Sequence, residues 1–238
     1  MINVLLPAMG TSAFFKDAYF PKPLTEINGK TMLEMVVDNY RALEPKNYIF
    51  VLNDEDCKKF HIDASIRILT PASQVIKLHN QTAGALCTCL MAIDYINDDF
   101  PLIIANSDQI IDVDYGNVIA HFDGIGADAG VITFPNIHPR WSYARLNGDE
   151  VNEVAEKRPV SKNAIAGFYY YKHGKDFIEA GKKVLLKQNN LEGKYYISGS
   201  MNELILMNKK IGYYEIAKEQ YKSFYSPAKI KEYEESIK

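Results

Sequence analysis

Two charged residues of this chain stand in settings that suit the binding of a phosphate group and its metal ion. Lys22 lies between Pro21 and Pro23, and proline restricts both its own φ and the residue before it, so the lysine is held in place. Asp108 follows the apolar run 101–105, which predicts a buried strand. A carboxylate at a strand end suits Mg²⁺, which takes one or two protein carboxylates and otherwise binds water and phosphate oxygens. We therefore predict Lys22 and Asp108 as catalytic residues, with Asp108 as the ligand of Mg²⁺.

The loop that follows the first strand could receive the phosphate itself. Residues 3–6 form a short apolar run that ends at a proline, and residues 8–13 are mostly small. Backbone N–H groups can approach an anion closely where no large side chain stands in the way. We predict that the nucleotide is bound by Ala8, Met9, Gly10, Thr11 and Ser12. The alternative is an ordinary strand-to-helix turn, with Lys22 solvated and Asp108 only capping the next turn.

Further side chains are suited to a base or to a phosphorylated acceptor. Gln81 offers both a donor and an acceptor, as the edge of a pyrimidine requires, with an exposed loop glutamine as the alternative. Glu156 and Lys157 could bind sugar hydroxyls and a phosphate, or simply decorate the surface. Asp112 and Asp114 match the Asp-X-Asp metal motif of glycosyltransferases that use nucleotide sugars, but their distance from the strand end favours a solvated turn.

The alternation of strand and helix patterns places Gly10 and Asp108 at the same edge of a sheet. Apolar runs predict strands at 48–52, 66–69, 75–78 and 101–105, and helical spacing predicts helices from 31, capped by Thr31, and from 82 to about 96. Such alternation gives a doubly wound α/β layer with right-handed crossovers, whose ligands bind beyond the carboxyl ends of the strands. We therefore expect one site that includes both residues.

In the second half of the chain, the predicted strands follow one another with few helices between them. Strands are expected at 129–134, 142–146, 151–155, 166–171 and 211–217, and helices at 174–186, 198–207 and 227–238. Because no linker, repeat or low-complexity tract interrupts the chain, we expect one domain over 1–238, with a nucleotide-binding half at 1–123 and an acceptor-binding half at 124–238. The aromatic residues expected in the core and the cleft wall are Trp141, Tyr143, Tyr169, Tyr170 and Tyr171. Tyr143 is assigned to the acceptor, and a cage for a choline-type cation is the alternative.

Composition narrows the class of protein. The 238 residues are 47% hydrophobic and 24% charged, with a formal net charge of −3, which is typical of a globular chain and argues against a nucleic-acid partner. No run of about 18 apolar residues predicts a membrane span, and the N-terminus lacks the pattern of a secretory signal. Three cysteines are too few and too unevenly numbered for a disulfide framework. We therefore expect a cytoplasmic location.

Taken in order, these segments resemble the sugar-phosphate nucleotidyltransferases, of the glucose-1-phosphate thymidylyltransferase kind. The resemblance spans nearly the whole chain, at residues 5–12, 21–24, 29–33, 82–86, 106–108, 156–159, 166–169 and 194–198. It implies a three-layer α/β fold that is glycosyltransferase-A-like (Rossmann-like), with a mixed, mostly parallel sheet. It also implies transfer of a nucleoside monophosphate from CTP, UTP, dTTP or GTP to a sugar 1-phosphate or a similar phosphorylated acceptor, with Mg²⁺ and release of pyrophosphate.

The resemblance also implies roles for particular residues, and two positions depart from it. The base would meet Gln81 and Gly84, and the sugar phosphate would meet Glu156, Lys157 and Gly167. Phe14 stands where the family loop carries an arginine for the triphosphate. Residues 223–227 lack the aspartate that often supplies a second metal carboxylate in the family. The choice of nucleotide and acceptor is therefore less well specified than the type of reaction.

Our hypothesis is an enzyme that makes an activated precursor for capsule or surface polysaccharide. The first rival is a glycosyltransferase that uses Asp112 and Asp114 with a nucleotide sugar. The second rival is a homologue that binds nucleotide without turnover, suggested by Phe14 and Ser223. Neither nucleic acid nor a membrane is expected as a partner, and a homo-oligomer is compatible with the sequence. The sequence specifies neither the base nor the acceptor.

Overall fold

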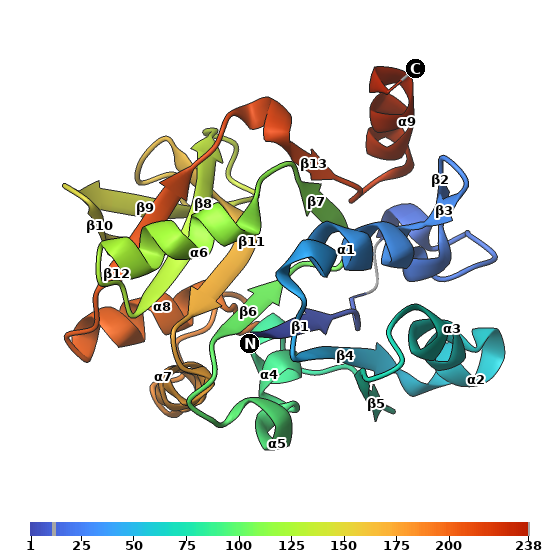
Figure 1. The fold of residues 1–238 in the computed structure, drawn as a ribbon, viewed down its shortest axis with the longest axis horizontal. Coiled ribbons are helices and arrows are strands. Elements are labelled where there is room, and N and C mark those ends of the chain that lie inside the picture. The colour runs from blue at the N-terminus through green and yellow to red at the C-terminus, as the bar shows by residue number, and fades with distance from the viewer. Residues whose placement is uncertain (11–12, 238) are drawn as a thin grey trace.

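The computed structural model describes residues 1–10 and 13–237. Its centre is a nine-stranded sheet with the order β10-β9-β11-β6-β1-β4-β5, in which β8 joins β11 to β12 (Figure 1). The strands are β1 Asn3–Pro7, β4 Asn47–Asn53, β5 Gln74–Leu78, β6 Leu102–Ala105, β8 Ala129–Pro135, β9 Ser142–Asn147, β10 Glu150–Glu156, β11 Asn163–Tyr171 and β12 Ile211–Glu215. Of these strands, all but β10 and β11 point in one direction. The predicted mixed, mostly parallel sheet is confirmed.

Helices and two short ribbons complete the described chain. The helices are α1 Met32–Tyr40, α2 Asp54–Phe60, α3 Ile62–Leu69, α4 Ala85–Leu90, α5 Ile93–Ile96, α6 Tyr115–Gly124, α7 Gly174–Leu186, α8 Ser198–Leu206 and α9 Pro227–Ser236. The 3₁₀ helices are η1 Ala13–Phe15, η2 Lys22–Leu24, η3 Arg41–Leu43 and η4 Lys218–Gln220. The ribbons pair β2 Glu26–Ile27 with β3 Lys30–Thr31, and β7 Gln109–Ile111 with β13 Tyr221–Ser223, both antiparallel. The second ribbon joins segments far apart in the sequence.

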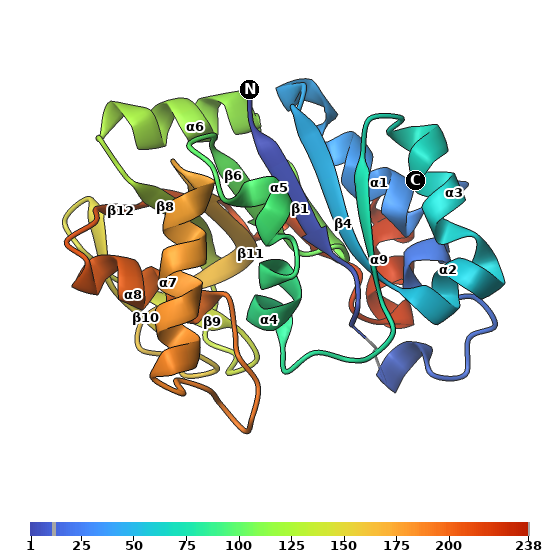
Figure 2. The same cartoon turned by 90° about the horizontal axis from the view of Figure 1, so that it is seen from below.

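The sheet separates two layers of helices, which gives the three-layer architecture expected from the sequence. Figure 2 shows α1 and α6 on one side of the sheet and α4, α5 and α7 on the other. Side chains alternate between the faces of a strand, so in β1 Val4 and Leu6 join the core under α1 and α6, whereas Leu5 joins the core under α4 and α7.

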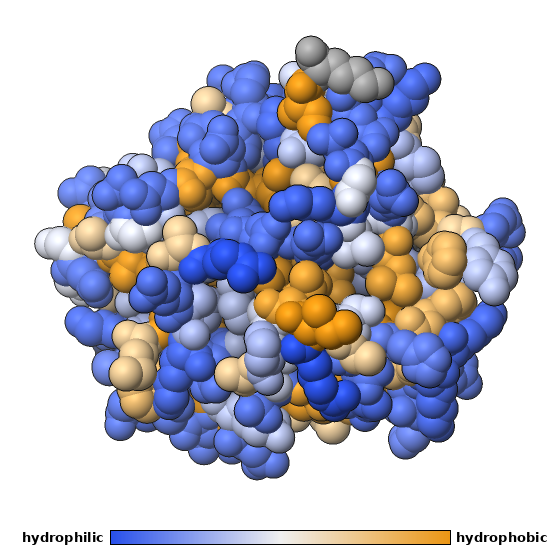
Figure 3. Space-filling model, turned by 45° about the vertical axis from the view of Figure 1, so that its right-hand side comes forward, coloured by the Kyte–Doolittle hydropathy of each residue, from blue (hydrophilic) through white to orange (hydrophobic). Residues whose placement is uncertain are grey.

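On the face of the molecule shown in Figure 3, hydrophilic residues surround the apolar ones. No helix in the described part of the chain is long and apolar enough to cross a membrane.

Local signals predicted most of the α-helices and the strands of the central sheet, with three differences among them. Thr31 caps α1 as expected, because its hydroxyl accepts the Glu34 N–H over 3.2 Å. Residues 66–69 are not a strand but the end of α3, where Ile62 and Ile66 are buried one turn apart. A short apolar run cannot by itself distinguish a strand from a buried helix face. The predicted helix from 82 to about 96 is divided into α4 and α5, and α6 was not predicted.

Candidate active site

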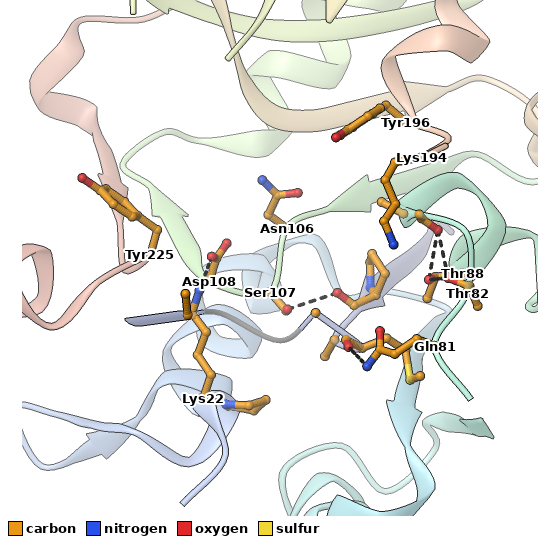
Figure 4. Close-up of a pocket in the computed structure, with 18 of the residues that line it drawn as sticks. Lys22, Gln81, Thr82, Thr88, Asn106, Ser107, Asp108, Lys194, Tyr196 and Tyr225 are labelled. Atoms are coloured by element: carbon orange, nitrogen blue, oxygen red, sulfur yellow. Dashed lines mark hydrogen bonds and ion pairs between the residues drawn. The ribbon is translucent and has the colours of Figure 1, made fainter. Parts of the chain in front are cut away.

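A cavity of about 730 Å³ lies at the carboxyl ends of β1 and β6 (Figure 4). Seven predicted site residues line it: Ala8, Met9, Gly10, Lys22, Gln81, Gly84 and Asp108. Thr11 and Ser12, which belong to the same predicted loop, lie outside the described residues. Segments far apart in the sequence meet here because parallel strands end at the same edge of the sheet. The position of the cavity is therefore the one that the strand pattern predicts.

Lys22 and Asp108 point toward each other at one end of this cavity (Figure 4). Lys22 Nζ lies 2.5 Å from Asp108 Oδ2, and the two side chains are 14% and 28% exposed. Both charges are partly withdrawn from water, which strengthens their attraction relative to a surface pair. The ion pair holds both side chains at this end of the cavity. A metal ion that enters the cavity would meet the Asp108 carboxylate, and a phosphate would meet the Lys22 ammonium.

The backbone around Lys22 is fixed by its neighbours. Lys22 begins the 3₁₀ helix η2, and Pro21, with φ −65° and ψ 153°, is the N-cap. Thr25 N–H donates to the Lys22 carbonyl over 3.0 Å, which closes the turn. The ammonium also lies 5.3 Å from the centroid of the Phe15 ring, within the range of a cation–π contact. These contacts supply the rigidity that the two prolines suggested.

The segment that carries Asp108 is tied to both ends of the chain. Ser107 Oγ donates to the Pro7 carbonyl over 3.1 Å, which joins the ends of β6 and β1. Phe224 N–H donates to the Asp108 carbonyl over 2.7 Å, directly after β13 pairs with β7. Because the backbone carbonyl is occupied in this way, the position of Asp108 is set and its carboxylate faces the cavity.

Gln109 connects the loop after β6 with β11. Gln109 is 1% exposed, and its Nε2 donates to the Gly167 carbonyl over 3.2 Å. Its Oε1 accepts from Asn106 Nδ2 over 3.1 Å and from the Tyr221 hydroxyl over 3.0 Å.

Gly167 has a φ of +59°, and a Cβ there would lie 2.1 Å from Asn106 Nδ2. Gly167, which was predicted to contact the sugar phosphate, is buried behind the cavity and does not line it.

Gly84 marks the point where residues 191–196 pack against the start of α4. Tyr195 N–H donates to the Ala83 carbonyl over 2.8 Å, and Leu86 N–H donates to the Tyr195 carbonyl over 3.1 Å. Gly84 has a φ of +120°, and a Cβ there would lie 2.4 Å from the carbonyl oxygen of Tyr195. Glycine is therefore required at this position for the two segments to close one wall of the cavity.

Replacing Gly84 by alanine should lower the free energy of unfolding by roughly 3 kcal/mol, because the new Cβ meets backbone atoms and the φ is strained. Gly29→Ala is the matched control, since Gly29 has a φ of +78° but no atom within 4 Å of the position that a Cβ would occupy. That control should lose about 1 kcal/mol from backbone strain alone. Urea denaturation measures both values. Equal losses in the two variants would show that the contact with Tyr195 is dispensable.

Gln81 links the loop after β1 with the segment that precedes α4. Its Nε2 donates to the Met9 carbonyl over 3.2 Å, so one amide hydrogen is used inside the protein. The amide oxygen can then accept a hydrogen bond from a base in the cavity. Thr82 and Thr88 follow on the same wall, with their hydroxyl oxygens 2.6 Å apart. Gln81, Thr82 and Thr88 therefore give this wall uncharged groups that can hydrogen-bond to a base.

Glu156 and Lys157 lie beside the main cavity rather than in it. Glu156 lines a neighbouring cavity of about 330 Å³, and Tyr196 lines both cavities. Glu156 Oε2 accepts from Ser198 Oγ over 2.8 Å and from Ser142 Oγ. Lys157 Nζ donates to the Tyr196 hydroxyl over 2.8 Å, and this hydrogen bond raises the pKa of the Lys157 ammonium. An acceptor that reached from one cavity to the other would pass Tyr196.

Tyr143 is a core residue, and its assignment to the acceptor was wrong. Its side chain is 0% exposed, and its hydroxyl donates to the His138 carbonyl over 2.6 Å. Alternation along β9 explains the difference, because Tyr143 points into the core while its neighbour Ser142 reaches Glu156. Residues 169–171 are also buried. These tyrosines therefore give no exposed cage for a choline-type cation.

Aromatic side chains stand at the two positions that depart from the family pattern. Phe14 is 62% exposed and lines the cavity, and Tyr225, within 223–227, lines it as well. The two ring centroids are 5.8 Å apart, with the planes at 74°. The guanidinium carbon of Arg140 lies 4.2 Å from the centroid of the Tyr225 ring. An edge-to-face aromatic pair therefore joins the N-terminal loop to the C-terminal segment at the cavity.

Asp112 and Asp114 do not belong to this cavity. Asp114 is the N-cap of α6, and its Oδ1 accepts from Gly116 N–H over 2.8 Å and from Asn117 N–H over 3.4 Å. Helix capping of this kind stabilises a helix by about 1 kcal/mol. Asp114 therefore has a structural role and Asp112 is exposed, in keeping with the turn that was favoured over an Asp-X-Asp metal motif.

Among the described residues that line the cavity, Asp108 is the only carboxylate. The described part of the chain brings together no group of three or more His, Cys, Asp or Glu side chains that could hold a metal ion. Mg²⁺ needs only one or two protein carboxylates when phosphate oxygens and water complete its shell. Asp108 therefore fits a metal ion that is bound together with a substrate phosphate.

Several lining residues were not among those predicted for the site. The polar and aromatic ones are Phe14, Thr82, Thr88, Asn106, Ser107, Lys194, Tyr196 and Tyr225. Asn106 and Ser107 directly precede Asp108, so adjacency to a predicted ligand was a usable signal. Lys194 begins a segment that matched the family, residues 194–198, but no role was assigned to it, because this segment reaches the cavity only through the packing against Gly84.

Comparison with known proteins gives the family. A family model described as Nucleotidyl transferase matches residues 18–211, well over half of the chain. The bifunctional protein GlmU of Thermodesulfovibrio yellowstonii is 23% identical over 236 residues, which cover 92% of this chain and 48% of that protein. The chain thus spans about half the length of the curated relatives that it matches.

The fold is shared with solved structures of other proteins. A nucleoside-diphosphate-sugar pyrophosphorylase from Vibrio cholerae RC9 superimposes with a TM-score of 0.84 at 21% identity, over 99% of this chain and 100% of that chain. HddC from Yersinia pseudotuberculosis gives a TM-score of 0.71 at 19% identity, over 100% of both chains. At such identities the likeness shows the fold alone, whereas the family model matches the sequence itself. The chain belongs to the nucleotidyl transferase family.

Proposed function

We propose that this protein transfers a nucleotidyl group from a nucleoside triphosphate to a sugar 1-phosphate, or to a similar phosphorylated acceptor, and releases pyrophosphate. The observation that carries the proposal is the facing pair of Lys22 and Asp108, 2.5 Å apart at one end of the cavity. A rigid cation and a carboxylate suited to Mg²⁺ are what a reaction between phosphate groups requires. The family supports the same type of chemistry.

In the proposed reaction an oxygen of the acceptor phosphate forms a bond to the α-phosphorus of the triphosphate. The bond from that phosphorus to the oxygen of the β-phosphate breaks, and pyrophosphate leaves on the opposite side. No general base is required, because the acceptor phosphate is already ionised near pH 7. Mg²⁺ bound at Asp108 would supply positive charge to the α-phosphate and the leaving group. Lys22 offsets charge on the same phosphates, so positioning and electrostatics provide the catalysis.

The substrates are assigned to opposite parts of the site. We place the base of CTP, UTP, dTTP or GTP against Gln81 and Gly84, and the triphosphate along the loop after β1. The acceptor occupies the side that 124–238 contributes, near Tyr196 and the neighbouring cavity lined by Glu156. A nucleoside-diphosphate-sugar pyrophosphorylase among the structural relatives favours a sugar phosphate. We assign the product to capsule or surface polysaccharide synthesis in the cytoplasm.

The test is a pyrophosphate-release assay with the four nucleotides against a panel of phosphorylated acceptors, in the presence of Mg²⁺. We expect release with at least one pair, and none when the nucleotide or the acceptor is omitted. Hydrolysis or transfer from a nucleotide sugar, without pyrophosphate from any triphosphate, would indicate a glycosyltransferase instead. Thermal stabilisation by nucleotides with no turnover across the panel would indicate a homologue that only binds.

A further inference from the structure

Lys194 extends into the cavity from the wall opposite Lys22, as Figure 4 shows. We propose that Lys194 is a phosphate-binding residue of the active site and the second cation on which the reaction depends. The proposal rests on the proposed function, since it concerns the phosphates of the same reaction. Lys194 was not among the predicted site residues, and its role follows from the charges that the fold collects around the cavity.

The charge balance of the cavity is the first observation. The charged residues that line it, among those the structure describes, are Lys22, Asp108 and Lys194. Lys22 and Asp108 neutralise each other through their ion pair. Within the described part of the chain, no carboxylate lies within 4.0 Å of Lys194 Nζ, whereas Lys187 on a neighbouring segment pairs with Glu203 at 2.6 Å. Lys194 therefore gives the cavity its net positive charge, and a phosphate is the ligand that such a charge attracts.

The placement of Lys194 is fixed by its backbone. Leu191 and Lys194 exchange two backbone hydrogen bonds of 3.0 Å. Between them, Glu192 and Gly193 have φ values of +52° and +73°, as in the tight turns that close β-hairpins. The next residue, Tyr195, is bonded to Ala83 and Leu86 on the far side. Lys194 is exposed, but its backbone is anchored on both sides, so the point from which its side chain enters the cavity is fixed.

The described part of the loop after β1 supplies no cation to the cavity. Its lining residues there, Ala8, Met9, Gly10, Ala13 and Phe14, are all uncharged, and the exposed Phe14 ring is apolar. The part of the cavity near Gln81 and Thr88 would otherwise hold no positive group among the described residues. Lys194 lies on that side of the cavity (Figure 4). It can therefore offset the charge of the triphosphate, or that of the acceptor phosphate beside Tyr196, and lower the repulsion between the two.

The test compares Lys194→Ala, Lys194→Arg and a control, Lys182→Ala, with the wild type. Lys182 is an exposed lysine of α7 that lies away from the cavity. We expect Lys194→Ala to lower kcat/KM on the order of 10- to 100-fold, the range for a lost hydrogen bond to a charged group. Lys194→Arg should stay within about fivefold of the wild type, because the charge is kept. The deficit of Lys194→Ala should shrink as KCl is raised, because salt screens the charge in the wild type.

Calorimetric titrations with each nucleotide and with glucose 1-phosphate identify the phosphate concerned. Weaker binding of a nucleotide to Lys194→Ala assigns the lysine to the triphosphate, and weaker binding of glucose 1-phosphate alone assigns it to the acceptor. Both results support the proposal. Unchanged titrations and an unchanged kcat/KM in Lys194→Ala would overturn it, as would a loss equal to that of Lys182→Ala. If the wild type releases no pyrophosphate, the proposed function fails, and the titrations still test Lys194 by themselves.

Discussion

Replacing Asp108 by asparagine is expected to lower kcat by about 10³-fold or more. Loss of a single group that stabilises transition-state charge costs about 10²–10³, and this change affects two such groups, the metal ion and Lys22. The shape of the side chain is kept, but the negative charge is lost. The metal ion then loses the only carboxylate among the described residues that line the cavity, and Lys22 loses its counter-ion. The measurement is pyrophosphate release at saturating substrates, repeated over a range of Mg²⁺ concentrations.

The control for this variant is Asp112→Asn. Asp112 is an exposed aspartate four positions further along the chain, and its side chain does not line the cavity. Its activity should stay within about twofold of the wild type, since surface substitutions away from such features change little. If Asp108→Asn kept more than a tenth of the wild-type kcat, Asp108 would not be the metal ligand and the proposed centre would be misplaced.

Replacing Lys22 by alanine is expected to lower kcat about 10²- to 10³-fold, the loss that follows when one group that stabilises charge in the transition state is removed. The ammonium lies 2.5 Å from Asp108, at the end of the cavity where the departing pyrophosphate is placed. Without it, the carboxylate is left with no protein counter-ion among the described residues. Binding of nucleotide should weaken less than kcat, because charge on the leaving group increases only as the reaction proceeds.

Lys30→Ala is the matched control for this lysine. Lys30 also forms an ion pair, with Asp38 at 2.8 Å, but its side chain is 53% exposed and lies outside the cavity. Its loss should leave kcat unchanged, because exposed pairs contribute little. The double variant of Lys22 and Asp108 should lose less than the product of the single losses, since the two groups act on each other. A strictly multiplicative loss would show that they act independently.

Lys22 and Asp108 could be found from the sequence because the rules that place them are local. Two prolines restrict one lysine, and an apolar run that ends in an aspartate marks the edge of a parallel sheet. The alternation within β1 likewise follows from the period of a strand, which sends Val4 and Leu6 to one core and Leu5 to the other. The common cavity follows from these rules together.

The residues that sequence reasoning missed or misplaced depend on packing between distant segments. Lys194 reaches the cavity because Gly84 admits the backbone of Tyr195. Tyr143 was misplaced because an aromatic residue on a strand suits a core or a cleft equally well, and only the register of β9 decides between them. Gly167 matched a family motif, yet its contact is with Asn106. Each outcome needed the tertiary structure.

The support for Asp108 has a consequence for the growing chain. Tyr221 lies 112 positions after Gln109, and Phe224, whose amide bonds the Asp108 carbonyl, comes later still. While the ribosome is still adding β12, the loop after β1 already exists in full, but the aspartate has no such partners. These two supports of the Asp108 segment can therefore form only after β13 has been synthesised, and a nascent chain released before β13 should bind Mg²⁺ and nucleotide poorly.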